Sequence, residues 1–563
     1  MDRRHDARHG RGIRRAVAAL CSGALLAAAG CSSSTADPGG PTTTTAPADD
    51  AASDEAGSPT GATCEVESDA EVEAVPVDGS DHDLDVTSLD GTTIRAHWFP
   101  VDGAEEPMPT VLMGPGWGLP GDTDVDAVGV LGALNIASLH DAGYHVLTWD
   151  PRGFGESGGT AQVNSVDAEA RDVQQLLGWL AAQPEVRLDG PGDPTSGMVG
   201  GSYGGGIQLV TAAIDCRVDA FVPVVAWHSL GTSLYKDETF KQGWASILNG
   251  VSATASLDPH ITSAAASGVA TGTLSEEDRQ WFLDRGPAEL VEDITAPTLL
   301  VGGTVDTLFT LDENITNFGI LRDSGVPTAM FWFCGGHGAC LTDAGDPRDM
   351  DVAIIAWLDR WVTRDASVDT GAAFSFLDQN GDRYTADDYP LPAGTPITAT
   401  GSGTLELTAD GGAGPMAPSE RGGLLDLLVG PVTPARAANA VDVPVTVEDD
   451  AMVVGAPELT LTYSGTVPDG ERPTRVFAQL VDDTTGVVLG NQITPVPLTL
   501  DGGTHEVTVP LEVVAHAVTA GTTLTLQIVA TTTAYGAPRL GGSVELTEIA
   551  ISLPVVTGYE PAS

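Results

Sequence analysis

The stretch Gly200-Gly201-Ser202-Tyr203-Gly204 is the part of this sequence that constrains the fold most strongly. It follows a short apolar run typical of a strand and precedes a run typical of a helix. A G-x-S-x-G in that context predicts a tight turn with a strained serine backbone, where glycine on either side avoids a steric clash. The turn lifts the hydroxyl above the sheet. Ser202 is therefore the candidate nucleophile, and the Tyr203 N–H is a candidate oxyanion donor.

A serine hydroxyl is a weak nucleophile at neutral pH, so Ser202 needs a base that is itself oriented by an acid. In a chain built around such a turn, the order is serine, aspartate, histidine. Asp306 comes just after a later strand-like run, and His337 comes just after the next one. The sequence therefore predicts Asp306 as the acid and His337 as the base. A helix N-cap is the alternative role for Asp306, with Asp312 as the competing acid.

A second oxyanion donor is expected from the loop after the third strand. That loop reads Gly114-Pro115-Gly116-Trp117-Gly118, and its glycines let the backbone approach a substrate. The Trp117 N–H is the candidate donor, and a plain Gly/Pro turn is the alternative. Asp150 and Arg152 follow the next strand, where we expect them to support loops below the site and take no part in the reaction.

Strand-like runs alternate with helical patterns between about residues 80 and 365, which is typical of a mostly parallel sheet covered by helices on both faces. The alternation stops over residues 228–293, where we expect a helical cap over the edge of the sheet. The expected strands are 84–89, 92–99, 110–113, 145–149, 198–201, 220–225, 298–301 and 329–333, and the expected helices are 131–142, 166–182, 205–214 and 352–362.

Beyond about residue 366, short alternating runs are separated by Gly, Asp-Gly and Pro turns, a texture typical of an all-β sandwich. We expect residues 411–440 to be a long exposed insertion. The stretch 378–382 has the composition of a calcium loop, but Arg383 stands where that loop needs Gly, so a hairpin turn is expected. The predicted organisation is a signal peptide over 1–30, a flexible tether over 31–61, a catalytic domain over 62–365 and a sandwich over 366–563.

The N-terminus has the features of an export signal. Arginines precede an apolar run, Ala16 to Ala29, that is too short to span a bilayer and ends at Gly30-Cys31. This ending resembles a bacterial lipobox, so Cys31 is expected to be the lipidated first residue of the mature chain; an unlipidated signal peptide is the alternative. We expect an extracytoplasmic protein held at the cell membrane by its lipid.

Four cysteines remain besides Cys31, and outside the cytoplasm an even set indicates disulfides. Cys334–Cys340 is the preferred pair because its loop is short, and Cys64–Cys216 would follow. Zinc is the competing interpretation, but no C-x-x-C or H-x-x-x-H spacing supports it. We therefore predict no metal and no cofactor.

The composition excludes several classes of protein. Lys and Arg number 25 against 78 Asp and Glu, giving a net charge of −53, and the only lysines are Lys236 and Lys241. Nucleic-acid binding needs clustered positive charge, so a nucleic-acid partner is not expected. With 42% hydrophobic residues, the chain has enough apolar material for buried cores, which excludes wholesale disorder.

Four motifs together resemble the α/β-hydrolases, in particular the Xaa-Pro dipeptidyl-peptidase and cocaine-esterase type of acyl hydrolase: 150–159, 200–204, 303–309 and 335–338. The resemblance implies an α/β-hydrolase domain with a helical cap, followed by a jelly-roll-like sandwich. It also implies Ser202 as nucleophile, His337 as base and Asp306 as orienting acid. Members of that type commonly use a Tyr hydroxyl as an oxyanion donor, whereas this loop has Trp117, so we expect a backbone donor.

The sequence thus predicts a lipid-anchored serine hydrolase that acts on a small acyl substrate, either a peptide bond after Pro or an ester. A carboxylesterase without peptidase activity is one alternative. The other is a non-catalytic surface lipoprotein that holds a partner through its sandwich.

Overall fold

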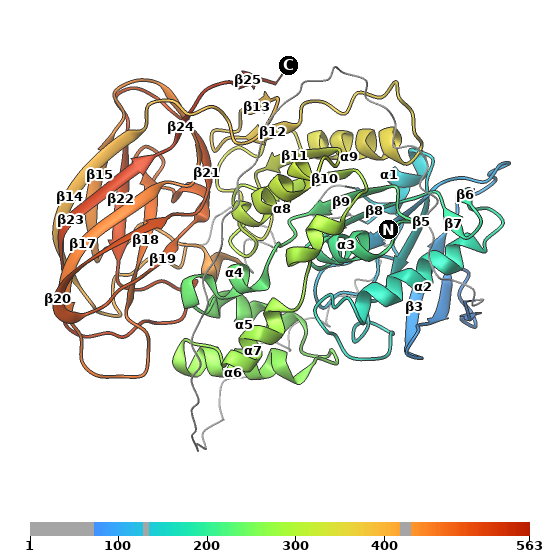
Figure 1. Ribbon diagram of the computed structural model, residues 1–563, viewed down its shortest axis with the longest axis horizontal. Coiled ribbons are helices and arrows are strands. Elements are labelled where there is room, and N and C mark those ends of the chain that lie inside the picture. Colours follow the sequence, from blue (N-terminus) through green and yellow to red (C-terminus); the bar gives the residue numbers. More distant parts are fainter. Residues whose placement is uncertain (1–71, 128–133, 417–428, 563) are drawn as a thin grey trace, which may run out of the picture. The chain divides into compact units, whose positions relative to one another are not determined.

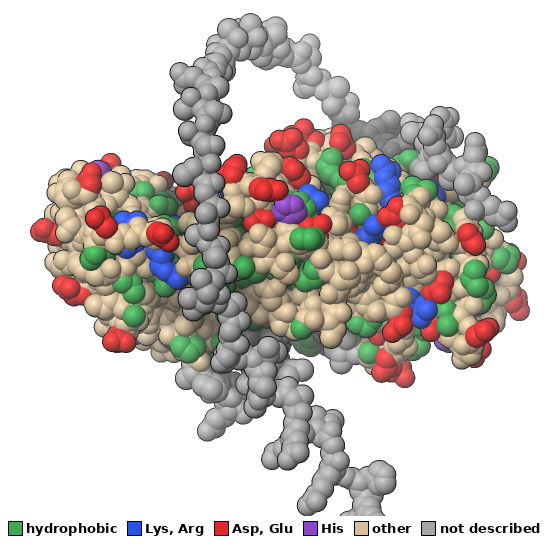
Figure 2. Space-filling view, turned by 90° about the horizontal axis from the view of Figure 1, so that it is seen from below, with side chains coloured by type: hydrophobic (Ala, Val, Ile, Leu, Met, Phe, Trp, Pro, Cys, Tyr) green, Lys and Arg blue, Asp and Glu red, His purple; other side chains and the backbone are tan. Residues whose placement is uncertain are grey.

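The computed structural model describes residues 72–127, 134–416 and 429–562. The predicted signal peptide, the tether, Cys31 and Cys64 lie outside these residues. Within the described residues, no helix is both long and apolar enough to cross a membrane. Figure 2 shows acidic side chains scattered over one face with fewer Lys and Arg side chains among them, as the net charge of −53 requires.

A twelve-stranded sheet forms the core of the predicted catalytic domain, in the order β1-β2-β3-β5-β4-β8-β9-β10-β11-β12-β13-β25 (Figure 1). The strands from β5 to β12 in that order run parallel, and antiparallel strands flank them on both sides. The strands are β1 (Ala74–Pro76), β2 (Asp83–Thr87), β3 (Thr93–Phe99), β4 (Thr110–Gly114), β5 (His145–Trp149), β8 (Ser196–Gly201), β9 (Ala220–Val224), β10 (Thr298–Gly303), β11 (Thr328–Phe333), β12 (Phe374–Leu377), β13 (Arg383–Ala386) and β25 (Glu560–Pro561), with β6 (Leu188–Gly190) and β7 (Asp193–Pro194) as a separate pair.

Helices cover both faces of this sheet. Alternate strand residues, such as Leu112 and Val111, point to opposite faces and join two separate apolar cores. The first core packs α2 (Glu169–Ala181), α3 (Tyr203–Ile214) and α8 (Leu311–Asp323), and the second packs α1 (Ile136–Asp141) and α9 (Arg348–Trp361). Burial of each Leu, Ile or Val contributes roughly 1.5–3 kcal/mol. The predicted parallel sheet with helices on both faces is confirmed.

The cap is helical, as predicted. It consists of α4 (Leu230–Leu234), α5 (Gln242–Val251), α6 (Pro259–Thr271) and α7 (Glu276–Leu283), with 3-10 turns over Lys236–Glu238 and Ala288–Asp293. Figure 1 shows these helices grouped together.

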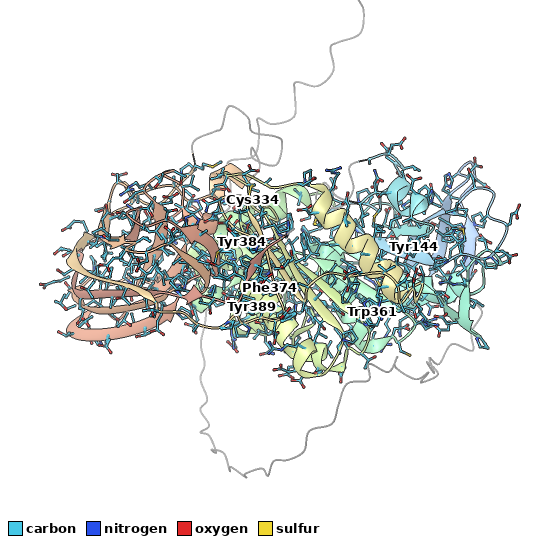
Figure 3. The ribbon with its side chains drawn as sticks, turned by 90° about the horizontal axis from the view of Figure 1, so that it is seen from above. Tyr144, Cys334, Trp361, Phe374, Tyr384 and Tyr389 are labelled. Atoms are coloured by element: carbon cyan, nitrogen blue, oxygen red, sulfur yellow. A yellow bond between two sulfur atoms is a disulfide. The ribbon has the colours of Figure 1, made fainter. Side chains whose placement is uncertain are left out.

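The boundary predicted at residue 365 is too early. The chain leaves α9 and adds β12 parallel to β11, β13 follows as a hairpin, and β25 at the C-terminal end returns to pair with β13. Phe374 of β12 is fully buried, with its ring 5.2 Å from that of Tyr389 (Figure 3), so these strands belong to the core of the main sheet. The expected hairpin turn at 378–382 is confirmed. The short run Phe374–Leu377 has no signal that separates it from a sandwich strand.

The C-terminal domain is an antiparallel sandwich, as predicted. Its two four-stranded sheets have the orders β14-β23-β17-β20 and β15-β22-β18-β19, and a third sheet has the order β21-β16-β24. The strands are β14 (Ile397–Glu406), β15 (Ala440–Thr446), β16 (Ala451–Gly455), β17 (Glu458–Thr466), β18 (Arg475–Asp482), β19 (Thr494–Pro497), β20 (Asp501–Pro510), β21 (Val514–Val518), β22 (Thr523–Val529), β23 (Ser543–Leu553) and β24 (Val555–Val556).

The expectation of an exposed insertion over 411–440 is wrong for its described part. Val429 and Val432 are buried with Trp244 of the cap, and a Cβ placed on Gly243 of α5 would lie 2.4 Å from Val432. The Gly, Ala and Pro content suggested exposure, but small residues also allow close packing against a helix.

Arg152 and Asp150 support the loops below the site, as expected. The Arg152 guanidinium donates to both carboxylate oxygens of Asp172, at 2.8 and 2.6 Å, and to Asp90 at 2.9 Å. Asp150 accepts from the backbone N–H groups of Gly121 and Glu156. These bonds tie the loop after β5 to the strands and to α2.

Arg152→Ala should lower the free energy of unfolding by about 3–5 kcal/mol, because it leaves the Asp172 carboxylate buried without its partner. Urea unfolding measures this change. Arg348→Ala, which removes an exposed arginine paired with Asp346, is the control and should leave stability unchanged. Equal stability of the two variants would contradict a supporting role for the buried pair.

Candidate active site

Ser202 sits on the predicted strained turn between β8 and α3. Its backbone has φ 57° and ψ −116°, a conformation that residues with a Cβ rarely adopt. The glycines around it are needed for close packing: a Cβ on Gly204 would lie 2.1 Å from the carbonyl oxygen of Gly114, and one on Gly200 would lie 2.7 Å from that of Gly204. The turn therefore fits only with glycine on both sides of Ser202, as the motif predicts.

The structure brings Ser202, His337 and Asp306 together in a hydrogen-bonded line. His337 Nε2 lies 2.8 Å from Ser202 Oγ, and His337 Nδ1 lies 2.7 Å from Asp306 Oδ2. Ser202 follows β8, Asp306 follows β10 and His337 follows β11, so the three residues meet at the carboxyl ends of these parallel strands. This is the arrangement in which a histidine can take the proton of a serine hydroxyl.

Asp306 is fully buried, and N–H groups surround its carboxylate. Oδ1 accepts from the backbone N–H groups of Leu308 and Phe309 at 2.9 and 2.8 Å. Oδ2 accepts from the backbone N–H of His337 at 3.1 Å in addition to its ring nitrogen. The loops that carry Asp306 and His337 are thus joined through one side chain.

Asp312, the competing acid, is not part of this line. It lies in α8, where its Oδ2 is 3.2 Å from Lys236 Nζ, and that nitrogen also lies 2.7 Å from Glu512 Oε1 of the sandwich. Asp312 therefore pairs with a cap lysine that also binds the sandwich, and the geometry favours Asp306 as the acid.

Both predicted oxyanion residues lie beside Ser202. Tyr203 is the first residue of α3, and its ring centroid is 5.2 Å from that of Trp117. The Trp117 indole N–H donates to the Leu248 carbonyl of α5 at 3.2 Å, which fixes its loop against the cap. Among the described residues, the backbone N–H groups of Trp117 and Tyr203 have no acceptor, so both are available to a ligand.

A cavity of about 950 Å³, open solvent at its mouth included, lies between Ser202 and the cap. Its lining is mostly apolar and includes Trp117, Leu230, Phe240, Leu248, Phe282 and Phe309. Lys241 and Arg279 are its charged lining residues, and no Asp or Glu of the described chain lines it. Apart from Trp117, the apolar lining residues were not assigned to a site from the sequence, because apolar side chains on cap helices look like ordinary core residues.

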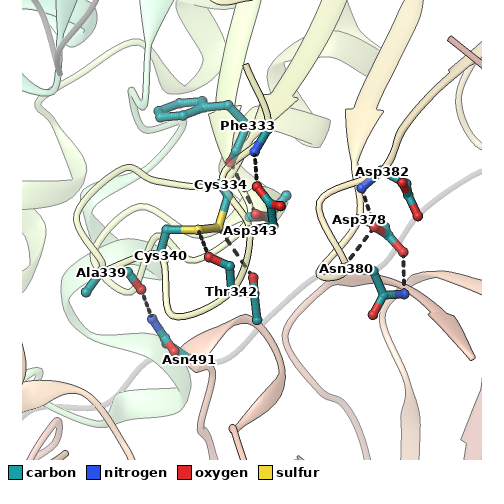
Figure 4. The surroundings of a disulfide bond; sticks show 12 residues. Phe333, Cys334, Ala339, Cys340, Thr342, Asp343, Asp378, Asn380, Asp382 and Asn491 are labelled. Atoms are coloured by element: carbon teal, nitrogen blue, oxygen red, sulfur yellow. Dashed lines mark hydrogen bonds between the residues drawn. A yellow bond between two sulfur atoms is a disulfide. The ribbon is translucent and has the colours of Figure 1, made fainter. Parts of the chain in front are cut away.

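The Cys334–Cys340 disulfide is present as preferred from the sequence, with Cα atoms 5.5 Å apart. It closes the loop that carries His337, and Figure 4 shows this loop beside Asn491 of the sandwich. Cys64 lies outside the described residues, so the Cys64–Cys216 pair stays a prediction. Within the described residues, no group of three His, Cys, Asp or Glu side chains is placed to hold a metal ion.

Residues 90–339 match the family model of X-Pro dipeptidyl-peptidase (S15 family), a range that contains Ser202, Asp306 and His337. A polyketide transferase from Penicillium is 31% identical over 145 residues, which are 25% of this chain and 44% of that protein. The chain thus spans less than half the length of this curated relative.

Three solved structures share the fold over most of both chains. A CocE/NonD family hydrolase from Staphylococcus aureus is 14% identical, with a TM-score of 0.60 and coverage of 88% of this chain and 99% of that one. An aminopeptidase from a Thaumarchaeota archaeon is 14% identical, with a TM-score of 0.63 and coverage of 87% and 99%. An α-amino acid ester hydrolase is 13% identical, with a TM-score of 0.63 and coverage of 88% and 98%.

These findings confirm the α/β-hydrolase fold with its C-terminal sandwich and the resemblance stated from the sequence. The family match covers less than half of the chain, and it contains all three residues of the hydrogen-bonded line.

Replacing Cys334 and Cys340 together by Ser should lower the free energy of unfolding by about 2 kcal/mol, because a short loop is no longer closed. It should also slow covalent labelling of the protein by a fluorophosphonate, because the loop that holds His337 gains freedom. Chemical unfolding and labelling kinetics measure the two effects. A labelling rate equal to that of the unmodified protein would show that the disulfide does not constrain the base.

Proposed function

We propose that this protein is a secreted, lipid-anchored serine hydrolase that cleaves carboxylic esters of uncharged acyl groups. The hydrogen-bonded line from Asp306 through His337 to Ser202, at the base of an apolar cavity, carries the proposal. The signal-like N-terminus and Cys31 support export and lipid anchoring.

In this proposal, Ser202 Oγ attacks the carbonyl carbon of the substrate while His337 Nε2 takes the hydroxyl proton. The Asp306 carboxylate holds the imidazole in orientation and stabilises its positive charge. The N–H groups of Tyr203 and Trp117 donate to the oxyanion that forms on the carbonyl oxygen. His337 then returns the proton to the leaving group, and water activated by the same histidine releases the acyl group from Ser202.

The cavity lining favours an ester over a peptide with a free N-terminus. A dipeptidyl-peptidase substrate carries an ammonium group close to the scissile bond, and a buried ammonium needs a carboxylate to replace its water. The described lining offers Lys241 and Arg279 but no Asp or Glu. An uncharged acyl group would bury apolar surface against Leu230, Phe240 and Leu248 without this cost.

Peptidase activity on Xaa-Pro substrates is the second candidate, because the family model matched by residues 90–339 is that of X-Pro dipeptidyl-peptidases. Ester hydrolysis and peptide hydrolysis would use the same three side chains, so the two candidate functions differ only in which substrate the cavity accepts.

Ser202→Ala should abolish labelling by a fluorophosphonate and lower kcat for p-nitrophenyl propionate by about 10⁴-fold or more, because the attacking oxygen is gone. Ser246→Ala, which removes an exposed serine of α5, is the matched control and should keep both activities. Labelling that persists in Ser202→Ala would refute the nucleophile. A folded protein that neither labels nor hydrolyses any acyl substrate would favour the non-catalytic binding alternative.

The p-nitrophenyl esters of propionate and alanine differ only in an amino group, so they test the acyl preference directly. At about pH 6, where the amino group is charged, kcat/KM should be at least about tenfold higher for the propionyl ester. Steady-state kinetics with alanyl-prolyl-p-nitroanilide as a third substrate completes the comparison. Equal or faster turnover of the alanyl ester or of the anilide would support the peptidase candidate instead.

A further inference from the structure

Two neighbouring side chains of the sandwich reach into the loops of the catalytic site. Asn491 and Gln492 lie between β18 and β19, at the end of a 3-10 turn over Leu489–Asn491. Gln492 Nε2 donates to the backbone carbonyl oxygen of Asp306 at 2.7 Å. Asn491 Nδ2 donates to the carbonyl oxygen of Ala339 at 2.8 Å, a bond drawn in Figure 4.

The two acceptor carbonyls belong to the two loops that must keep a fixed position relative to each other. Asp306 is the proposed acid, and Ala339 lies two residues after His337 inside the loop closed by the disulfide. In the described chain, Gln492 is the sole donor to the Asp306 carbonyl, and Asn491 is the sole donor to the Ala339 carbonyl. A buried carbonyl without a donor costs about 1–3 kcal/mol, so each loop would move to find another partner.

The backbone of this sandwich segment is held in an uncommon conformation. Gly490 has φ 63° and Asn491 has φ 54°, both in the left-handed region. A Cβ on Gly490 would lie 3.1 Å from the carbonyl oxygen of Thr304, two residues before Asp306. Both amide side chains are buried, with exposed fractions of 1% for Asn491 and 6% for Gln492. The segment is therefore shaped to fit against the loop of the acid.

The cap holds the same loop from another direction. Lys241 Nζ donates to the carbonyl oxygens of Thr307 and Leu308 at 3.0 and 2.9 Å. The Trp244 indole N–H donates to Thr307 Oγ1 at 3.0 Å. Three consecutive carbonyls, starting with that of Asp306, thus accept from side chains outside their own loop, so the loop depends on its neighbours for its shape.

We propose that Asn491 and Gln492 are positioning residues, through which the sandwich holds the acid and the base of the catalytic site in register. The inference rests on the proposed function and adds a role for the C-terminal domain to it. The two side chains touch neither substrate nor reacting atoms; they act through the backbone of Asp306 and Ala339.

The test compares three variants of the full chain. Gln492→Met keeps the side-chain volume but removes the donor to Asp306. Asn491→Gly removes the donor to Ala339, and glycine is well suited to a positive φ. Gln479→Met is the matched control: Gln479 is equally buried in the sandwich, and its amide donates to Ala435 and Gln527 without reaching the catalytic domain.

For each variant, kcat and KM are measured with p-nitrophenyl propionate, together with the rate of fluorophosphonate labelling and the Tm. Gln492→Met and Asn491→Gly should lower kcat and the labelling rate by about 10-fold or more, because small displacements of catalytic groups cost rate. KM should stay within about twofold of the unmodified value, since the cavity lining is untouched. Gln479→Met should share any loss of Tm but keep its kcat.

Two results would overturn the inference. One is a kcat in Gln492→Met and Asn491→Gly equal to that of Gln479→Met, which would reduce the contacts to domain packing. The other is a rise in KM at constant kcat, which would place their effect on substrate binding. An unmodified protein that neither labels nor hydrolyses the ester would instead refute the proposed function, and the inference would fall with it.

Discussion

Burying a carboxylate away from water costs several kcal/mol unless hydrogen-bond donors replace the lost water. Asp306 is fully buried, and its two oxygens accept from the backbone of its own loop and from His337. Because the bond to the His337 ring is one of these, the position of the proposed base follows from the burial of the acid. The hydrogen bond from His337 to Ser202 depends in turn on this position, so the geometry of the whole site depends on the Asp306 loop.

The rest of the molecule holds this loop and its neighbour from several directions. The parallel sheet brings the carboxyl ends of β8, β10 and β11 to one edge, and the disulfide closes the loop that carries His337. Side chains of the cap and of the sandwich donate hydrogen bonds to the backbone that follows β10. The sandwich is therefore joined to the catalytic domain at the site itself. The returning strand β25, which pairs with β13 of the main sheet, adds a further connection between the two domains.

The local parts of the site could be predicted from the sequence because they depend on neighbouring residues. A glycine-flanked serine between a strand and a helix defines the turn of Ser202, and strand exits place Asp306 and His337 in order. The predicted domain boundary at residue 365 was wrong because Phe374–Leu377 has the same residue pattern as a strand of the sandwich. The contact between Gln492 and Asp306 joins residues far apart in the chain, and a polar residue in a sandwich loop carries no signal of its partner.

The catalytic role of Ser202 is tested most directly by a crystal structure of the protein after reaction with a fluorophosphonate. We expect the phosphorus atom to be bonded to Ser202 Oγ, with the phosphoryl oxygen within hydrogen-bond distance of the backbone N–H groups of Tyr203 and Trp117. We also expect His337 to stay hydrogen-bonded to Asp306. Phosphorus bonded to another residue, or a phosphoryl oxygen directed away from both N–H groups, would rule out the proposed site.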